Sequence, residues 1–156
     1  MIDYQKIYHT GVLVPDLSAA MEKYGKAVQV TWASVVQQDG FGLWTHERGQ
    51  EHVKLSFTYS CEGPQHLELI QGPPGTVWDG TKNPGIHHVG LFSDDIGADV
   101  DACLKAGWKF VASSKSPDEG YGLFAYMQAT DGMIFEFVTS EGKPLFERWW
   151  AGGDLF

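Results

Sequence analysis

The sequence predicts an α+β fold of two βαβββ modules, on the basis of an internal repeat, two amphipathic helices and a shared order of strands. The segment 9–17 (HTGVLVPDL) matches the segment 88–96 (HVGLFSDDI) half a chain length later. In both segments a histidine begins a short apolar strand, a glycine follows two residues later, and an aspartate lies seven residues after the histidine. Because a repeated motif indicates a repeated structural unit, we expect two copies of one module.

Each copy of the motif is followed by apolar residues at helical spacing. These residues are Leu17, Ala20, Met21, Tyr24 and Val28 in the first half, and Ile96, Val100, Cys103 and Leu104 in the second. Asp16, and Asp94 or Asp95, stand where a helix N-cap accepts hydrogen bonds from free backbone amides, and Gly25 and Gly107 lie near the expected helix ends. Each half is therefore expected to place one amphipathic helix directly after its first strand.

Three further strands are expected in each half from runs of apolar and β-branched residues. They cover 30–36, 53–59 and 66–71 in the first half, and 109–113, 122–128 and 133–139 in the second. The segments 37–42 and 113–122 are rich in Gly, Asp and Ser, and we expect them to be loops at the rim of the sheet, where such loops often cover a pocket. The strand order repeats as β-α-β-β-β.

A chain of 156 residues is too short for two ordinary domains, so we expect one domain covering 1–156. Prolines and glycines from 72 to 85 interrupt any regular element. The expected parts are module 1 (about 5–72), a linker (73–84), module 2 (about 85–140) and a C-terminal tail (141–156). The tail contains two adjacent tryptophans, so we expect it to pack on its own module, close a cavity or form a subunit interface.

The composition excludes several classes of partner. A formal net charge of -9 disfavours nucleic acid and anionic lipid surfaces. No apolar run is long enough for a membrane span, and no secretory signal pattern begins the chain. Cys61 and Cys103 are isolated, which is typical of buried thiols in a reducing compartment. We therefore expect a cytoplasmic protein that acts on a small-molecule substrate and has neither a nucleic-acid nor a membrane partner.

Four ionisable residues lie within apolar strand segments: His9, Glu68, His88 and Glu136. Burying a carboxylate on the inner face of a sheet costs on the order of several kcal/mol, unless the carboxylate is protonated, paired or bound to a cation. Taken singly, such a glutamate usually faces solvent and such a histidine is usually a hydrogen-bonded packing residue. Here both modules offer the same pair, and nitrogen and oxygen donors of this kind suit a divalent metal. His87 adjoins His88, and strand alternation predicts that it points away from the site.

The sequence resembles the vicinal oxygen chelate superfamily, which includes glyoxalase I, methylmalonyl-CoA epimerase, extradiol dioxygenases and bleomycin-resistance proteins. The resemblance rests on the segments 8–17, 66–70, 85–91 and 131–137 in this order. It implies a half-open mixed β barrel, with one metal ligand from the first and last strand of each module. Carried over, these ligands are His9, Glu68, His88 and Glu136, the residues already selected from the sequence itself.

The resemblance also implies an activity. We expect a metal-dependent isomerase, epimerase or lyase that uses one divalent ion (Zn, Ni, Co, Mn or Fe) and moves a proton beside a chelated carbonyl or enolate oxygen. Glu136 or Glu68 would be the base, with no sequence ground for choosing between them. Many relatives are homodimers, so a homodimer is expected, with ligands from one chain or from two. The alternatives are an Fe(II) extradiol-type dioxygenase, and a metal-free enzyme or small-molecule binding protein of the resistance type.

The nearest branches of the family differ in their ligands. Methylmalonyl-CoA epimerases typically have glutamine where this chain has Glu68. The His, Glu, His, Glu pattern is closer to bacterial-type glyoxalase I, but the arginine and asparagine contacts of that family to glutathione are not found. Aromatic residues expected near the concave face are Trp32, Phe41, Trp44, Trp78, Phe124 and Tyr126. Those that line a cavity would favour a hydrophobic or aromatic substrate.

Overall fold

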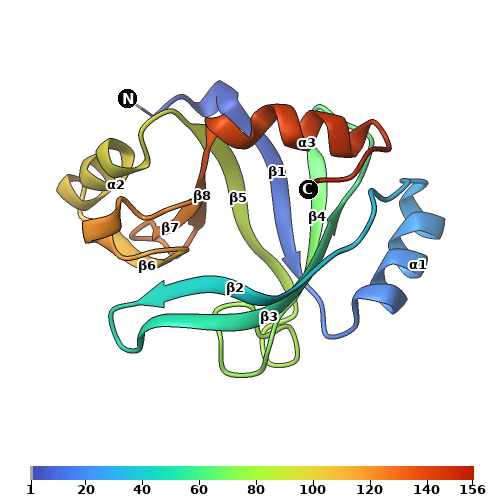
Figure 1. The fold of residues 1–156 in the computed structure, drawn as a ribbon, viewed down its shortest axis with the longest axis horizontal. Coiled ribbons are helices and arrows are strands. Elements are labelled where there is room, and N and C mark those ends of the chain that lie inside the picture. Colours follow the sequence, from blue (N-terminus) through green and yellow to red (C-terminus); the bar gives the residue numbers. More distant parts are fainter. Residues whose placement is uncertain (1) are drawn as a thin grey trace.

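The fold is a mixed β barrel with helices packed against it (Figure 1). The computed structural model describes residues 2–156. The first half contains β1 (Ile7–Leu13), α1 (Leu17–Val28), β2 (Val36–Thr45), β3 (Gly49–Tyr59) and β4 (His66–Gln71). The second half contains β5 (Gly85–Ser93), α2 (Ile96–Lys105), β6 (Lys109–Ser113), β7 (Phe124–Gln128), β8 (Ile134–Thr139) and α3 (Lys143–Trp150). Both halves follow the expected βαβββ order, and the α+β fold class is confirmed.

The two module helices begin at the expected aspartates. Asp16 accepts a hydrogen bond from the Ala19 amide (2.8 Å), and Asp95 accepts one from the Ala98 amide (2.9 Å), so Asp95 caps α2 and Asp94 does not. Gly25 lies inside α1, which continues for three further residues, to Val28. None of the helices in the described part of the chain has the length and hydropathy that a membrane-spanning helix requires.

The strands follow the order β1-β4-β3-β2-β6-β7-β8-β5 around the barrel. Within the modules β1 pairs with β4, and β5 with β8, in parallel, and the modules are joined by the antiparallel pair of β1 and β5. On the opposite side β2 and β6 meet through the single residue pair Trp44↔Ser113. The barrel was expected to be half-open; it is closed, but at this second seam by one residue pair only.

The second strand differs from the expectation from sequence. Residues 30–35 contribute only the isolated bridge Trp32↔Ser60, whereas the expected loop 37–42 is part of the long strand β2. Polar residues and two glycines mask a strand signal in this segment. Pairing with β3 along its length overrides the weak local propensity, and a register shift between Gln38 and Phe41 accommodates the glycine between them.

The C-terminal tail, which contains α3, lies against the barrel (Figure 1). Two of its residues, Trp149 and Leu155, belong to the same core cluster as residues of the strands. Trp149 of α3 is fully buried, and its indole N–H donates to the backbone oxygen and the hydroxyl of Ser34, each at 2.9 Å. The ring of Trp150 stacks on His66 with centroids 3.7 Å apart. The Arg148 guanidinium donates to the carbonyl oxygens of Asp154 and Leu155. The tail is therefore an integral part of the core.

We expect Trp149→Ala to lower the free energy of unfolding by about 3–5 kcal/mol, because it leaves a cavity in the core and removes the hydrogen bonds to Ser34. Urea denaturation followed by tryptophan-independent far-UV circular dichroism measures this change. Phe156→Ala is the matched control, since Phe156 lies in the same tail and is 76% exposed. Equal stability of the two variants would contradict the anchoring role of Trp149.

Candidate metal centre

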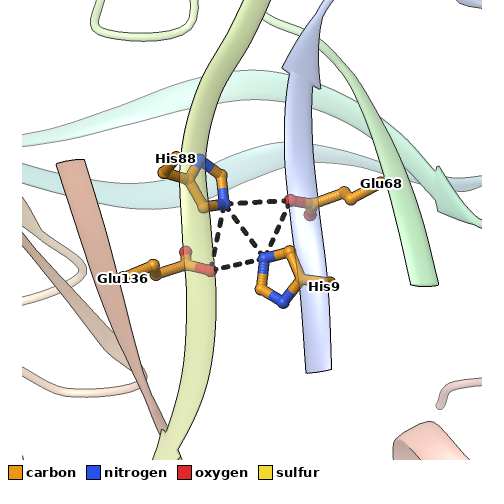
Figure 2. Close-up of side chains that lie close together, drawn as sticks. All are labelled: His9, Glu68, His88 and Glu136. Carbon is orange, nitrogen blue, oxygen red and sulfur yellow. Dashed lines mark hydrogen bonds and ion pairs between the residues drawn. The ribbon is translucent and has the colours of Figure 1, made fainter. Parts of the chain in front are cut away.

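The four strand residues singled out from the sequence meet inside the barrel, from one chain (Figure 2). His9 and His88 point their Nε2 atoms at each other across 3.0 Å, and both rings are buried. From His9 Nε2 the distances are 3.1 Å to Glu136 Oε2 and 3.4 Å to Glu68 Oε2. From His88 Nε2 both carboxylate oxygens lie at 3.3 Å. One buried donor cluster therefore contains a histidine and a glutamate from each module.

Strand register explains why the four side chains converge. Gly11 of β1 lies opposite Glu68 of β4 on one side and opposite His88 of β5 on the other. Gly90 of β5 lies opposite His9 and Glu136 in the same way. Residues directly opposite each other in a sheet point to the same face. Two cross-strand rows thus lie on the inner face of the barrel, and each holds a carboxylate, a glycine and an imidazole. The rows are Glu68–Gly11–His88 and Glu136–Gly90–His9.

The central glycine of each row leaves the space that the imidazole of that row occupies. A Cβ atom at Gly11 would overlap the ring of His88, and one at Gly90 would overlap the ring of His9. Each module therefore supplies the glycine on which the other module's histidine lies. This packing accounts for the glycine that follows each histidine by two residues in the repeat.

The charges of the cluster balance one another. Burial raises the pKa of both glutamates, but His88 and His9 outweigh this effect and hold the pKa of Glu136 well below its ordinary value, with that of Glu68 also lowered. Burial lowers the pKa of His88, but Glu136 and Glu68 outweigh it and raise this pKa to about 9; the pKa of His9 is raised by the same carboxylates against burial. The carboxylates and the imidazoles thus favour each other's charged forms, and a divalent cation between the same donors would compensate the two carboxylates in a similar way.

The donor atoms also have the spacing that a metal ion requires. Donors about 2.1 Å from an ion, at angles between tetrahedral and right angles, lie about 3.0–3.4 Å apart. The distances from the two imidazole Nε2 atoms to the other donors, from 3.0 to 3.4 Å, fall in this range, and all four donor atoms lie within 4.8 Å of one another. Glu68 Oε2 is buried without a hydrogen-bond partner within residues 2–156. The residues therefore fit a divalent ion.

The strand alternation around His87 is broken. Gly11 pairs with His88 but Val12 pairs with Ile86, so His87 is an extra residue in β5 at this point. Its ring lies 5.2 Å from that of Tyr126, and its Nδ1 is 2.9 Å from Nδ1 of His88. Burial and the neighbouring His88 lower the pKa of His87 to about 4. His87 is therefore not one of the four clustered donors, but because of the bulge its ring lies beside the rings of His88 and Tyr126, which simple strand alternation does not predict.

An apolar cavity of about 140 Å³ leads from the two glutamates to the C-terminal tail. Of the aromatic residues expected on the concave face, Phe41, Trp78, Phe124 and Tyr126 line it. Trp32 instead lies against α1 and donates to the Met21 carbonyl oxygen, and Trp44 packs on Phe110.

Other lining residues were not selected from the sequence. Leu55, Phe57 and Tyr59 alternate along β3, so strand periodicity contains a signal for them. Leu145, Phe146 and Leu155 come from the tail, whose position no local pattern specifies. The cavity therefore combines a predictable strand face with a wall that only the tertiary structure shows.

We expect Gly11→Ala and Gly90→Ala each to weaken divalent metal binding by about 10- to 100-fold, because the added methyl group displaces a donor ring. Titration with Zn²⁺ against a competing chelator dye measures the affinity. Gly40→Ala in β2 is the control, since a Cβ at that position meets nothing within 4 Å. Wild-type affinity in both row variants would contradict the packing argument.

Comparison with known proteins agrees with this architecture. The family model of the Glyoxalase/Bleomycin resistance protein/Dioxygenase superfamily matches residues 8–126. The uncharacterized protein YwbC of Bacillus subtilis is 29% identical over 135 residues, which are 85% of this chain and 96% of that protein. The hypothetical protein BH1468 of Bacillus halodurans has a similar structure, with a TM-score of 0.61 at 14% identity over 86% of this chain and 94% of that one.

A methylmalonyl-CoA epimerase variant of Streptomyces coelicolor, solved with 2-nitronate-propionyl-CoA, has a TM-score of 0.57 at 21% identity. The match covers 86% of this chain and 94% of that chain. At this identity the likeness shows a shared fold. The family match spans most of the chain, including both histidines of the cluster and Glu68. The chain belongs to the Glyoxalase/Bleomycin resistance protein/Dioxygenase superfamily.

Proposed function

We propose that this protein is a metal-dependent isomerase, epimerase or lyase that moves a proton next to a carbonyl or enolate oxygen of a small apolar or aromatic metabolite. The observation that carries the proposal is the buried cluster of two histidines and two glutamates at the inner end of an apolar cavity. Two charged carboxylates at such a place need a compensating cation. A cavity that leads to them gives a substrate access to the same point.

In this proposal His9, Glu68, His88 and Glu136 hold one divalent ion. A bound divalent ion supplies Lewis-acid stabilisation of negative charge that develops on a substrate oxygen. The imidazoles are buried and positioned by Gly11 and Gly90, so they would act as fixed nitrogen donors, each neutral when the ion is bound. Both glutamates line the cavity, whereas His9 and His88 do not, so the carboxylates are the charged groups that a substrate meets.

The proton is moved by one of these two carboxylates. A general base needs to lie within hydrogen-bond reach of the C–H that it deprotonates, and Glu68 and Glu136 are the only acidic residues among the described residues that line the cavity. The carboxylate takes the proton from the carbon beside the carbonyl group. Protonation of the opposite face by the second carboxylate gives epimerisation, and return of the proton to the neighbouring atom gives isomerisation.

The cavity wall defines the substrate class. Among the described lining residues there is no lysine or arginine, and most are aromatic or aliphatic. Recognition of phosphate or carboxylate groups ordinarily uses these cations. The part of the substrate that enters the cavity is therefore uncharged and apolar, apart from the oxygen atoms that reach the cluster. Phe41, Trp78 and Phe124 form mutual ring contacts with centroids 5.7 to 6.1 Å apart and provide a surface for an aromatic group.

We expect purified wild-type protein to bind one equivalent of Zn²⁺, Ni²⁺, Co²⁺, Mn²⁺ or Fe²⁺, and the double variant His9→Ala, Glu136→Ala to bind none. The double variant removes half of the donor set. Elemental analysis after loading and dialysis measures the metal content. His52→Ala is the control because His52 lies on the exposed side of β3. A wild type without metal after loading would move the proposal to a metal-free enzyme or a binding protein.

We expect the metal-loaded protein to speed deuterium exchange from D₂O into the CH₂ group of 2-hydroxyacetophenone, an aromatic compound with neighbouring oxygens. Proton NMR measures the exchange. Replacing the base, by Glu136→Gln or Glu68→Gln, lowers the rate by about 10²- to 10⁴-fold, as for loss of a general base. Metal content is measured on each variant, so that loss of the ion is separated from loss of the base. Undiminished exchange in both variants would refute the assignment.

A further inference from the structure

We propose that His87 is the positioning residue of His88: its imidazole Nδ1 accepts a hydrogen bond from the Nδ1–H of His88 and so fixes the orientation and tautomer of that ring. The two Nδ1 atoms lie 2.9 Å apart. This inference rests on the proposed metal centre, because it concerns how one of its four donors is held.

The position of the two nitrogens of His88 leads to this assignment. Nε2 faces Glu68, Glu136 and His9, which places it inside the cluster. Nδ1 faces away from the cluster and toward His87. Histidines that bind a metal through one nitrogen commonly use the other nitrogen as a hydrogen-bond donor to a fixed partner. His87 occupies the place of that partner.

The direction of the hydrogen bond follows from proton counting. A neutral imidazole that offers the lone pair of Nε2 to a cation carries its proton on Nδ1. His88 is then the donor, and Nδ1 of His87 must offer a lone pair. His87 is therefore a neutral imidazole with its own proton on Nε2. Both rings are thus confined to one tautomer by a single contact.

The β-bulge is what makes this contact geometrically accessible. In a regular strand, neighbouring side chains point to opposite faces, so adjacent imidazoles would diverge. The extra residue in β5 at His87 changes this direction, and the two rings meet at right angles with centroids 5.1 Å apart. Bulges commonly redirect a side chain near a functional site, and here the redirected side chain reaches a candidate ligand.

The first module has a matching register shift between Ile7 and His9, but no equivalent hydrogen bond within residues 2–156. Tyr8 occupies the position before His9 that His87 occupies before His88, and its ring packs on Phe92 with centroids 3.9 Å apart. Nδ1 of His9 is buried and has no hydrogen-bond partner within residues 2–156. Both histidines therefore direct Nε2 into the cluster, but within residues 2–156 only His88 has a hydrogen-bond partner for its Nδ1. His88 is the ligand whose orientation a second side chain fixes.

A purely structural role of His87 makes a different prediction. Its ring packs against Tyr126, with centroids 5.2 Å apart and the planes nearly perpendicular. If packing is its role, an aromatic ring at this position suffices. If positioning is its role, a hydrogen-bond acceptor at the place of Nδ1 suffices. His87→Phe retains the ring and removes the acceptor, whereas His87→Asn retains an acceptor at this place and removes the ring.

The experiment measures Zn²⁺ affinity by competition with a chelator dye, together with the Nδ1–H signal of His88 in ¹H–¹⁵N spectra of the Zn²⁺-loaded proteins. Thermal unfolding of the metal-free proteins reports packing separately. We expect His87→Phe to weaken Zn²⁺ binding by about 10- to 100-fold, the range for loss of such a hydrogen-bond partner, and to lose the protected His88 signal. We expect His87→Asn to restore both readouts toward wild type.

Two results would overturn the inference. One is wild-type Zn²⁺ affinity in His87→Phe, and the other is an equal loss in His87→Asn and His87→Phe. Wild-type protein that binds no Zn²⁺ would overturn the metal centre itself. This outcome is distinguished from the other two because the wild-type protein is measured before any variant is compared with it.

Discussion

The antiparallel register of β1 and β5 is the constraint on which the rest of the site depends. It sets Gly11 opposite His88 and Gly90 opposite His9, so each imidazole lies over a glycine of the other module. The parallel pairs β1–β4 and β5–β8 then add one glutamate to each row. A slip of one residue between β1 and β5 would turn one set of side chains to the outer face. The two histidines therefore depend directly on this register, and the two glutamates meet them through the parallel pairs on either side of it.

Burial makes this register energetically consequential. The cluster is buried, so the attraction between imidazoles and carboxylates is strong, and so is the penalty for an unpaired member. The same low-dielectric surroundings strengthen the interaction of a cation with the two carboxylates. The tail contributes to these surroundings because Trp149, Phe146 and Leu155 belong to the same apolar cluster as the barrel interior. Packing of the tail thus helps to keep the surroundings of the cluster apolar, which strengthens the interactions between its charged groups.

Much of this arrangement could be predicted from the sequence, because the repeat encodes it locally. His9 and His88 lie in the matching strands β1 and β5, and Glu68 and Glu136 interrupt apolar strands that end their modules. Charged residues in apolar strands are rare enough to mark the inner face when they recur. The glycines of the repeat were visible too, but their role depends on contacts between modules, which spacing along one strand does not reveal.

Other features depend on tertiary pairing and could not be predicted in this way. The segment 37–42 has a loop-like composition, yet it is a strand because β3 pairs with it. Alternation predicted that His87 points away from the site, but it did not predict the contact between His87 and His88, because no residue in the sequence marks the bulge at this point of the β1–β5 pairing. A homodimer, expected from the resemblance to relatives, stays a prediction about contacts between chains.

The symmetric and asymmetric parts of the molecule have different tasks. Duplication of the module provides the same pair of a histidine and a glutamate twice, and this symmetry suits an ion, which has no preferred face. A substrate does have faces, and the cavity wall that it meets is asymmetric: Trp78 comes from the connection between the modules, and Phe146 and Leu155 come from the tail. These segments have no counterpart in the repeat, and the tail lies beyond the residues that match the family. Specificity can therefore change through the connection and the tail while the register of β1 and β5 preserves the site.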